Sequence, residues 1–494
     1  MKTKHILLGL SLGLLGGFTA CDVTDLNPKD SITDNSYWNT VSDLENYAKG
    51  FYMNLTGKGL RADGSENLDD LNTLDERSDN RLVASPDQWL FNEWVIPSEA
   101  NFDSKWYWNN IRNLNYFMTR YQRVNATESE VNPVVAVIRF FRAFDYFDKI
   151  KTFGDVPWYD KDLTTADTDE LYKARDDRDF VLGKIIEDLE FAIEWLPEKS
   201  AAEVGALHKD AARTFLARVC LHYGTYKKYH NVSTSPTSQE LLQKAATLAK
   251  EVMDSGLYDI VQGSDAGANQ SAFADYPLYY ANQFTQEDLT TNKECILARV
   301  FEADVLTHNL ARGGGVGLSK DFAESFLCKD GLPIANSSEY KGDETLDDEM
   351  ANRDPRMYQI IDSKYRPYTV KSNGMRVVNS GIDDKKEFSP SEEPGTNVHS
   401  APGLTGTATG YSPIKLVSAS QSQQDAVKTS SYDWFVFRYA EILLIYAEAK
   451  CELGECTQAV LDETINKLRD RVEMKHLTVS PVADLNPVDY GYSI

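Results

Sequence analysis

The segment RYAEILLIYAEA, residues 438–449, decides the fold class of this 494-residue chain. Leu443 and Leu444 lie three and four positions after Ala440. Ala447 continues this pattern, which is the spacing of one face of an amphipathic helix. The segment therefore predicts a helix that packs one apolar face against the rest of the protein.

Six further stretches carry apolar residues at the same helical spacing. They lie in residues 108–121, 137–147, 181–196, 212–223, 242–252 and 461–472. Two pairs of stretches, in residues 213–253 and 439–471, have small residues near the expected helix crossings and a glycine after one of the helices. This arrangement is typical of helical hairpins of the tetratricopeptide kind. The sequence therefore predicts a mainly α fold with a tetratricopeptide-like helical-hairpin scaffold.

The middle of the chain has a different composition. Residues 257–432 are rich in Gly, Ser, Asn, Asp and Pro, and their apolar residues do not keep a helical period for long. Short helices are expected around residues 320–327 and 347–361. Long irregular segments inside a globular domain usually carry function. We therefore expect a loop-rich, ligand-facing layer, inserted between helical pairs at about residues 105–256 and 433–475.

The start of the chain predicts export and lipid attachment. A basic start precedes an apolar run at residues 6–15, which is too short to span a bilayer. Small residues follow, and then a lone cysteine, Cys21, in a context similar to a bacterial lipobox. Residues 1–20 are thus interpreted as a lipoprotein signal peptide and residues 21–494 as a single domain. A simple secretory signal with an incidental cysteine is the alternative.

The charge balance limits the partners. The chain has a formal net charge of −25 and a pI near 4.7, so it repels the phosphate backbone of nucleic acids. After Cys21, no apolar stretch approaches the length of a membrane span. We therefore expect no nucleic-acid partner, and contact with a membrane through the lipid anchor alone.

Five cysteines follow Cys21, and their pattern is not that of a metal site. Cys220 and Cys451 lie in apolar helical stretches, where a free cysteine acts as a small hydrophobic side chain. Four residues separate Cys451 from Cys456, a spacing that zinc sites use, but no second Cys or His pair follows nearby. The odd number of cysteines argues against a full disulfide framework. We expect core packing for these residues, and neither a metal nor a cofactor.

The motifs of common enzymes are missing. The chain has no Gly-x-Ser-x-Gly elbow and no His-Glu-x-x-His helix, and its histidines are scattered singly. Carboxylates are abundant, so a glycosidase-type pair stays open. The acidic run at residues 343–349 offers oxygen ligands for calcium but lacks a loop template, and a solvated surface is the alternative. The sequence predicts that the protein is not an enzyme.

Aromatic residues in irregular segments are the best candidates for ligand contacts. An aromatic face beside hydrogen-bonding groups suits a sugar ring, which has apolar C–H faces and hydroxyl edges. The candidate ligand-binding residues are Asp79, Asn80, Arg81, Trp89, Trp94, Tyr276, Tyr279 and Tyr280. The alternative is that these rings pack the loops onto the scaffold. The tryptophans beside helical stripes or tight turns are expected to be structural, namely Trp106, Trp108, Trp158, Trp195 and Trp434.

Several motifs, in the same order along the chain, resemble the SusD/RagB-like family, the nutrient-binding lipoproteins of Bacteroidetes outer membranes. Residues 438–449 resemble its signature helix. The other matching segments are FGDVP at residues 153–157, the Ala-Arg helix at 211–219, NRDPRM at 352–357 and INKLRDR at 465–471. Behind a lipobox, this order of motifs extends the resemblance over nearly the whole chain.

The resemblance implies a function as well as a helical fold. It implies a lipid-anchored protein of the outer membrane, exposed at the cell surface, whose loops bind an oligosaccharide without making or breaking bonds. It also implies a partner, a SusC-like TonB-dependent barrel that receives the nutrient. Two alternatives remain, a peptide-binding lipoprotein as in the RagB branch and a surface glycosidase.

Two expectations concern the end of the chain. Glu441 and Glu448, on the signature helix, are expected to meet Arg469 or Arg471 on the next helix. Family members usually continue beyond the position of Ile494, so the C-terminal part of the family fold is expected to be missing.

Overall fold

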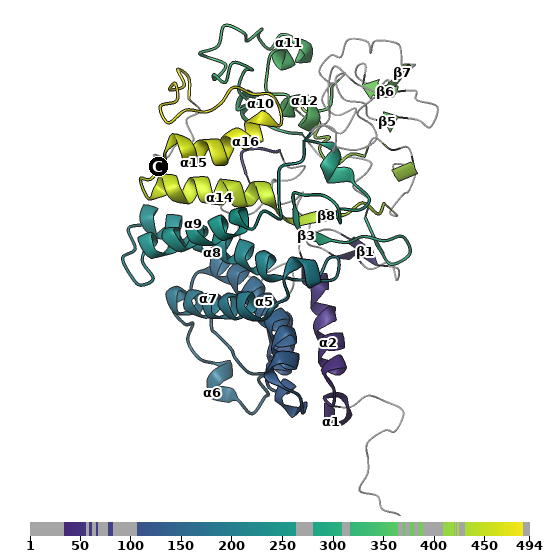
Figure 1. Ribbon diagram of the computed structural model, residues 1–494, viewed down its shortest axis with the longest axis vertical. Helices are drawn as coiled ribbons and strands as arrows, with labels where there is room; N and C mark the ends of the chain where they lie inside the picture. Colours follow the sequence, from purple (N-terminus) through teal and green to yellow (C-terminus); the bar gives the residue numbers. More distant parts are fainter. Residues whose placement is uncertain are drawn as a thin grey trace, which may run out of the picture.

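The computed structural model of the protein is a stack of helices with irregular segments along one side and at one end (Figure 1). It describes residues 34–55, 59–61, 66–67, 78–82, 106–262, 280–308, 317–363, 369–370, 376–379, 385–388, 409–418, 420, 422–423 and 430–487. Helices that follow one another along the chain mostly lie next to one another in the stack.

The scaffold is built from helices that pack as successive neighbours. They are α2 (Val41–Lys49), α4 (Asn109–Met118), α5 (Glu128–Phe153), α7 (Arg178–Trp195), α8 (Lys209–Tyr229), α9 (Ser238–Asp254), α14 (Tyr439–Glu452), α15 (Gln458–Glu463) and α16 (Ile465–Asp470). α5 packs on α7, α7 on α8, α8 on α9, and α9 on α14 (Figure 1). This succession of helix pairs confirms the predicted mainly α, tetratricopeptide-like scaffold.

Shorter elements connect and cover the scaffold. The short α-helices are α1 (Asp34–Tyr37), α6 (Thr168–Leu171), α10 (Lys320–Glu324), α11 (Leu346–Met350) and α12 (Arg356–Ile360). The 3₁₀ helices are η1 (Gly50–Asn54), η3 (Tyr121–Arg123), η4 (Lys199–Ala201) and η7 (Asn282–Thr285). The strands are β1 (Gly59–Arg61), β2 (Glu66–Asn67), β3 (Cys295–Arg299), β4 (Leu306–Thr307), β5 (Thr369–Val370), β6 (Arg376–Asn379), β7 (Lys385–Phe388) and β8 (Trp434–Arg438).

The long helix α5 shows how local sequence sets helix ends. Thr127 and Glu130 form a capping box at its start, which satisfies backbone N–H groups that lack helical partners. The helix ends at Gly154, whose φ of 73° is accessible to glycine at little cost. A Cβ at this position would lie 2.5 Å from the tip of the flexible Arg178 side chain, which can move aside, so the positive φ is the main reason for glycine here.

One large hydrophobic core runs through the scaffold and reaches the strands. Phe140 of α5, Phe215 of α8 and Phe437 of β8 are all buried in it. The ring centroids of Phe140 and Phe215 lie 5.5 Å apart, and those of Phe215 and Phe437 lie 6.0 Å apart. The core therefore joins the first helical pairs to the strand that leads into the signature helix α14.

The strands form small sheets, and one of them is continuous with the scaffold. β3 pairs antiparallel with β8, with Cys295 opposite Arg438 and Arg299 opposite Trp434. α14 begins at Tyr439, directly after β8. β2, β1 and β4 form a second sheet, and β5, β6 and β7 form a third. Residue Arg438 thus belongs both to a sheet and to the start of a scaffold helix.

The predicted ion pairs of the signature helix are wrong. Glu441 accepts two hydrogen bonds from Arg218 of α8, at 2.5 and 2.7 Å, because its carboxylate lies on the side of α14 that faces α8. Arg471 instead donates to Glu294, just before β3. Glu448 is exposed and forms no ion pair with any residue in the described ranges. The charges of α14 therefore connect it to an earlier hairpin rather than to the next helix.

Two expected helices are interrupted. The stretch 461–472 breaks at Thr464, whose φ of −129° and ψ of −90° separate α15 from α16. The stretch 347–361 splits into α11 and α12, because Asn352 has a φ of 58° and a proline follows at position 355. In both stretches the apolar periodicity predicts one helix, but a residue with non-helical backbone angles separates two shorter helices.

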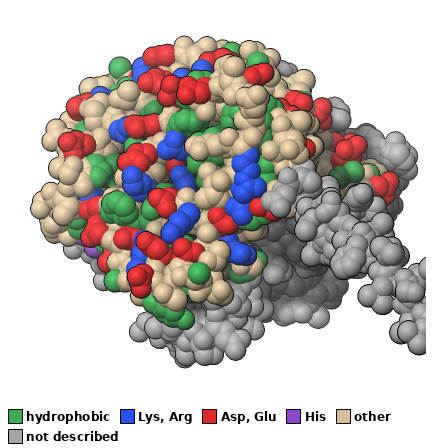
Figure 2. All heavy atoms as spheres, turned by 90° about the horizontal axis from the view of Figure 1, so that it is seen from below, with side chains coloured by type: hydrophobic (Ala, Val, Ile, Leu, Met, Phe, Trp, Pro, Cys, Tyr) green, Lys and Arg blue, Asp and Glu red, His purple; other side chains and the backbone are tan. Residues whose placement is uncertain are grey.

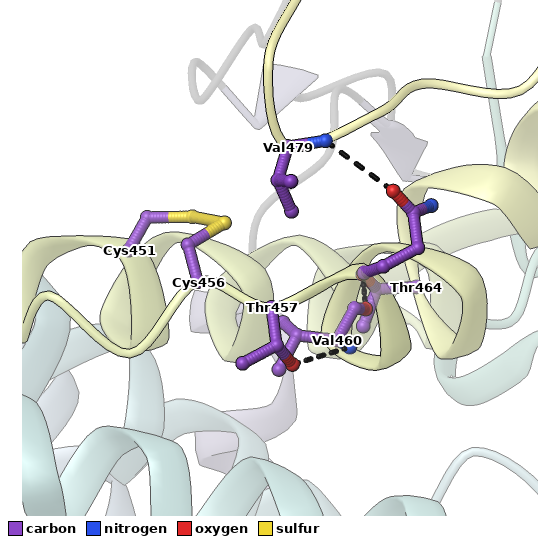
Figure 3. Close-up of a disulfide and its surroundings, with 7 residues drawn as sticks. Cys451, Cys456, Thr457, Val460, Thr464 and Val479 are labelled. Atoms are coloured by element: carbon purple, nitrogen blue, oxygen red, sulfur yellow. Dashed lines mark hydrogen bonds between the residues drawn. A yellow bond between two sulfur atoms is a disulfide. The ribbon is translucent and has the colours of Figure 1, made fainter.

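The expectation that Cys451 packs as a free cysteine is also wrong. Cys451 lies exposed in the last turn of α14 and forms a disulfide with Cys456 (Figure 3). Gly454, with a φ of 76°, turns the chain back and brings the two Cα atoms within 4.4 Å. Thr457 then caps α15 by accepting a hydrogen bond from the Val460 amide. The disulfide therefore closes the turn between two scaffold helices.

The surface of the scaffold carries charges of both signs. Seen from the end where α1 and α6 lie, acidic and basic side chains are interspersed (Figure 2). Several of these charges form ion pairs, such as Arg120 with Asp34 and Asp162, at 2.7 and 3.0 Å. Among the helices within the described ranges, none combines the length and the apolar character needed to cross a bilayer.

Candidate ligand-binding layer

Residues 257–432, here called the loop layer, have a small hydrophobic core of their own. Its buried members are Leu318, Ala323, Leu346, Met350, Met357, Tyr358, Ile361 and Tyr411. They come from α10, α11, α12 and the segments around them, which lie at the top of the view in Figure 1. This core is much smaller than the main core, and buried polar contacts add to it in holding the short helices together.

The buried guanidinium of Arg353 holds the short helices together. It donates to the carbonyl oxygens of Ala323 at 2.9 Å, Phe326 at 2.7 Å and Glu349 at 3.2 Å. These carbonyls lie at or just beyond the ends of α10 and α11, where helical partners are missing. Burial lowers the pKa of Arg353 below its usual range. The NRDPR turn, residues 352–356, is therefore structural.

Asp433 joins two other segments of the layer to β8. Its buried carboxylate accepts hydrogen bonds from the backbone amides of Leu289 at 3.1 Å and Phe301 at 2.9 Å. Burial raises the pKa of Asp433, although these two hydrogen bonds oppose the shift. The layer is thus attached to the scaffold at the residue that precedes β8.

The polar candidates Asp79 and Asn80 lie at the start of α10. Their backbone carbonyls accept hydrogen bonds from the hydroxyl and the amide of Ser319, at 2.5 and 2.9 Å. Arg81 pairs with Leu318 as an antiparallel bridge. Asp79 and Asn80 are exposed, whereas Arg81 is partly buried. The structure therefore presents two polar side chains to solvent on a loop that is fixed by its main chain.

Tyr280 is placed differently. Gln359 of α12 accepts hydrogen bonds from the amides of Tyr280 and Ala281, both at 3.0 Å. The partly buried ring meets Phe284 edge-on, with centroids 5.0 Å apart. Tyr280 and Ala281 are thus fixed to α12 by their backbone amides.

The remaining candidates lie outside the residues that the structure describes. They are Cys21, Trp89, Trp94, Tyr276 and Tyr279. Of the five tryptophans expected to be structural, Trp106, Trp108, Trp158 and Trp195 belong to the main core or pack against it. Trp434 is partly buried in β8.

Three cations that were not among the predicted ligand-binding residues lie near Tyr280 and Phe284. The guanidinium carbon of Arg471 lies 5.3 Å from its ring centroid and the Lys415 Nζ lies 5.4 Å from it. Arg438 lies 5.3 Å from the centroid of the neighbouring Phe284 ring. We call Lys415, Arg438 and Arg471 the basic cluster. Lys415 and Arg471 are 56 positions apart in the sequence, so no short sequence pattern connects the three residues.

A second concave surface lies on the scaffold. An open polar groove of about 650 Å³ is lined by residues of α8, α9 and α14. Arg213 in this groove donates to Asp210 at 2.8 Å and to Glu251 at 3.1 Å, and Lys250 pairs with Asp254 at 2.7 Å. The charges of the groove are thus largely paired with one another, which makes it a weaker candidate than the loop layer.

Two buried titratable groups of the loop layer, Glu349 and His308, form hydrogen bonds that hold its segments together. The buried carboxylate of Glu349 accepts hydrogen bonds from the Tyr411 hydroxyl at 3.2 and 3.0 Å, and burial raises its pKa. Burial also lowers the pKa of His308 to about 4, against the opposing effect of its hydrogen bond to the Tyr432 carbonyl. Within the described ranges, no group of three or more His, Cys, Asp or Glu side chains is arranged to hold a metal ion.

The fold and this layer match one class of protein. A family model described as the SusD family matches residues 263–485, and one described as starch-binding associating with outer membrane matches residues 27–221. SusD-like protein P2 of Formosa agariphila is 23% identical over 499 residues, which cover 97% of this chain and 83% of the relative.

Solved structures of similar proteins share the fold. A SusD-like protein from Bacteroides fragilis aligns with a TM-score of 0.65 and 22% identity, over 92% of this chain and 83% of the other. A SusD-like carbohydrate-binding protein from the same species gives a TM-score of 0.64 and 20% identity, over 91% and 81%. The chain belongs to the SusD/RagB-like family.

Proposed function

We propose that the protein binds oligosaccharides through its loop layer and has no catalytic activity. The observation that carries this proposal is that Asp79 and Asn80 expose polar side chains while Ser319 binds their backbone carbonyls and holds their loop against the layer. The chain that carries this loop is a member of the SusD/RagB-like family. The similarity to a carbohydrate-binding protein of known structure supports it. The proposed contact residues are Asp79, Asn80, Arg81, Trp89, Trp94, Tyr276, Tyr279 and Tyr280.

Calorimetry with defined ligands tests this proposal. Purified protein is titrated with a panel of oligosaccharides and, separately, with peptide pools. We expect binding of at least one glycan, no binding of peptides and no release of shorter products during incubation. Replacement of Trp89 and Trp94 by Ala should weaken binding, because stacking rings contribute apolar area to sugar recognition. Binding of peptides alone would assign the protein a RagB-like cargo, and product release would indicate a glycosidase.

We further propose that the protein acts at the cell surface, held by a lipid on Cys21, and passes its ligand to a SusC-like TonB-dependent barrel. The lipobox-like context of Cys21 and the family description, which associates starch binding with the outer membrane, support this location. A multiply acylated cysteine anchors stably, since each buried methylene contributes about 0.8 kcal/mol. Co-purification of a barrel with tagged protein from outer membranes tests the partner.

The variant Cys21→Ala separates anchoring from binding. It should leave glycan binding by the purified protein unchanged and remove the protein from the cell surface. Surface labelling of intact cells measures the second effect. Persistence of the variant at the surface would contradict the proposed anchor.

A further inference from the structure

The basic cluster carries more positive charge than the described residues around it neutralise. Glu294 is the carboxylate in contact with it, and Glu294 already accepts hydrogen bonds from Arg438 at 2.6 Å, from Arg471 and from the Val261 amide at 3.1 Å. Lys415 forms no ion pair within the described ranges, and its Nζ lies 4.3 Å from the Phe284 ring centroid. Two of the three cations thus pair with one saturated carboxylate, and Lys415 pairs with no carboxylate in the described ranges.

A fourth cation nearby does not change this balance. Arg356 lies close enough to interact with Tyr280, but it is paired with Asp354 through contacts of 2.5 to 3.1 Å. Burial raises the pKa of the Tyr280 hydroxyl, yet Lys415, Arg438 and Arg471 outweigh this effect and the net shift is downward. The surroundings of Tyr280 therefore favour a negative charge at this place.

Several buried polar atoms beside the cluster lack hydrogen-bond partners in the described part of the chain. They are the Nε of Arg471, both amide atoms of Gln283 and the Nδ2 of Asn282. Gln283 is fully buried and follows Tyr280 by three positions, in η7. These atoms are closed to solvent, so a ligand does not contact them directly, but they show that hydrogen bonding around the cluster is incomplete.

The members of the basic cluster differ in their exposure to solvent. The Arg471 side chain is only 2% exposed, whereas that of Arg438 is 20% exposed. Lys415, Tyr280 and Phe284 are also partly exposed. The cluster thus combines the buried guanidinium group of Arg471 with cationic and aromatic side chains that are partly exposed.

We propose that the basic cluster of Lys415, Arg438 and Arg471 binds an anionic substituent, a carboxylate or a sulfate, on the glycan that the loop layer captures. This inference rests on the proposed function and adds a substrate class to it, the acidic glycans. Such a group offers two or more oxygens to the Lys415 ammonium group and the partly exposed Arg438 guanidinium group, and the buried Arg471 adds positive charge. Tyr280 and Phe284 contact the C–H face of the sugar. The net charge of −25 opposes a polyanion as a whole, whereas the local excess of positive charge acts at contact distance, well inside the screening length of about 8 Å at physiological ionic strength.

The variant Lys415→Gln tests this inference. It removes the cation without a carboxylate partner and leaves the Arg438–Glu294–Arg471 network intact. The matched control is Lys184→Gln, which makes the same charge change on α7, where Lys184 pairs with the exposed Glu187. Calorimetry compares three ligands, a neutral oligosaccharide, the same backbone carrying uronate or sulfate groups, and free inorganic sulfate. Thermal melting confirms that each variant is folded.

We expect the native protein to bind the acidic oligosaccharide about tenfold more tightly than the neutral one, as for one hydrogen-bonded charge pair. Lys415→Gln should remove most of this difference without changing the neutral affinity, and Lys184→Gln should not affect it. Equal affinity for neutral and acidic glycans would overturn the inference and leave the proposed function intact. Failure to bind any glycan would overturn both. Free sulfate that binds as tightly as the acidic glycan would show a site for inorganic anions and overturn the substrate class.

Discussion

The helical scaffold and the loop layer are stabilised in different ways. The scaffold buries one large apolar core that runs from α2 to α14, and it adds ion pairs between helices, such as Arg142 with Asp188. The loop layer buries a much smaller core, and single side chains such as Arg353 and Asp433 bind several backbone groups each. The scaffold therefore depends on many interchangeable apolar contacts, and the layer depends on a few specific polar ones.

The largest expected effect breaks the scaffold. Phe215→Ala removes a buried ring that contacts both Phe140 and Phe437, and we expect it to lower the free energy of unfolding by about 4 kcal/mol. Chemical denaturation measured by circular dichroism gives this value. Phe180→Ala, at a ring that is 49% exposed, is the control and should change stability by less than about 1 kcal/mol. Similar losses of unfolding free energy for both variants would mean that burial of Phe215 in the core does not stabilise the scaffold.

The next effect breaks the layer alone. Arg353→Met keeps much of the side-chain volume but leaves the carbonyls of Ala323, Phe326 and Glu349 without their donor. We expect the layer to lose about 3 kcal/mol of local stability, because each unsatisfied buried acceptor is costly. Hydrogen exchange should rise in residues 320–361 and stay low in α5 and α8. Equal exchange in both regions would show that scaffold and layer unfold as one unit.

A smaller effect depends on pH. Burial lowers the pKa of His308 from 6.5 to about 4, so the unfolded chain binds a proton in this range and the folded layer does not. Stability is therefore fully present above pH 6.5 and falls as the pH drops toward 4, by about 2 kcal/mol at pH 5. His308→Gln should reduce this loss in denaturation curves at pH 7.5 and pH 5. An unchanged difference between the two pH values would show that other groups cause it.

The smallest effect concerns the contact between distant helices. Arg218 and Glu441 form a bidentate pair whose side chains are 35% and 28% exposed. We expect Arg218→Ala to cost about 1 kcal/mol, because solvent screens a partly exposed pair. A double-mutant cycle with Glu441→Ala isolates the pair from the loss of each side chain. A coupling energy near zero would remove this pair from the forces that fix α14 on α8.

The sequence predicted the scaffold far better than the layer, for a physical reason. Apolar periodicity is a local signal, and it located α7, α8, α9 and α14. It missed the break at Thr464, because one non-helical residue hardly disturbs a stripe. It also missed the disulfide, since Cys451 continues the stripe of α14 but lies on its exposed side.

The site depends on pairings that no local pattern reveals. Glu294 meets Arg438 and Arg471 across 144 and 177 positions of the chain. Lys415 stands in an irregular segment, where a lone lysine is usually a solvated surface residue. The aromatic candidates in loops were identified by chemistry alone, and the structure describes only Tyr280 among them. Residue types suited to ligand contacts can be chosen from the sequence, but only the folded structure shows which of them lie close together.

The attachment of residues 79 and 80 has a consequence for how this protein can evolve. Ser319 binds their backbone carbonyls, and the two side chains point to solvent. Most changes of these side chains therefore leave the loop in place and cost little stability. Mutations can therefore change the side chains at positions 79 and 80 one at a time, while the hydrogen bonds from Ser319 to the backbone carbonyls keep the loop in the same position.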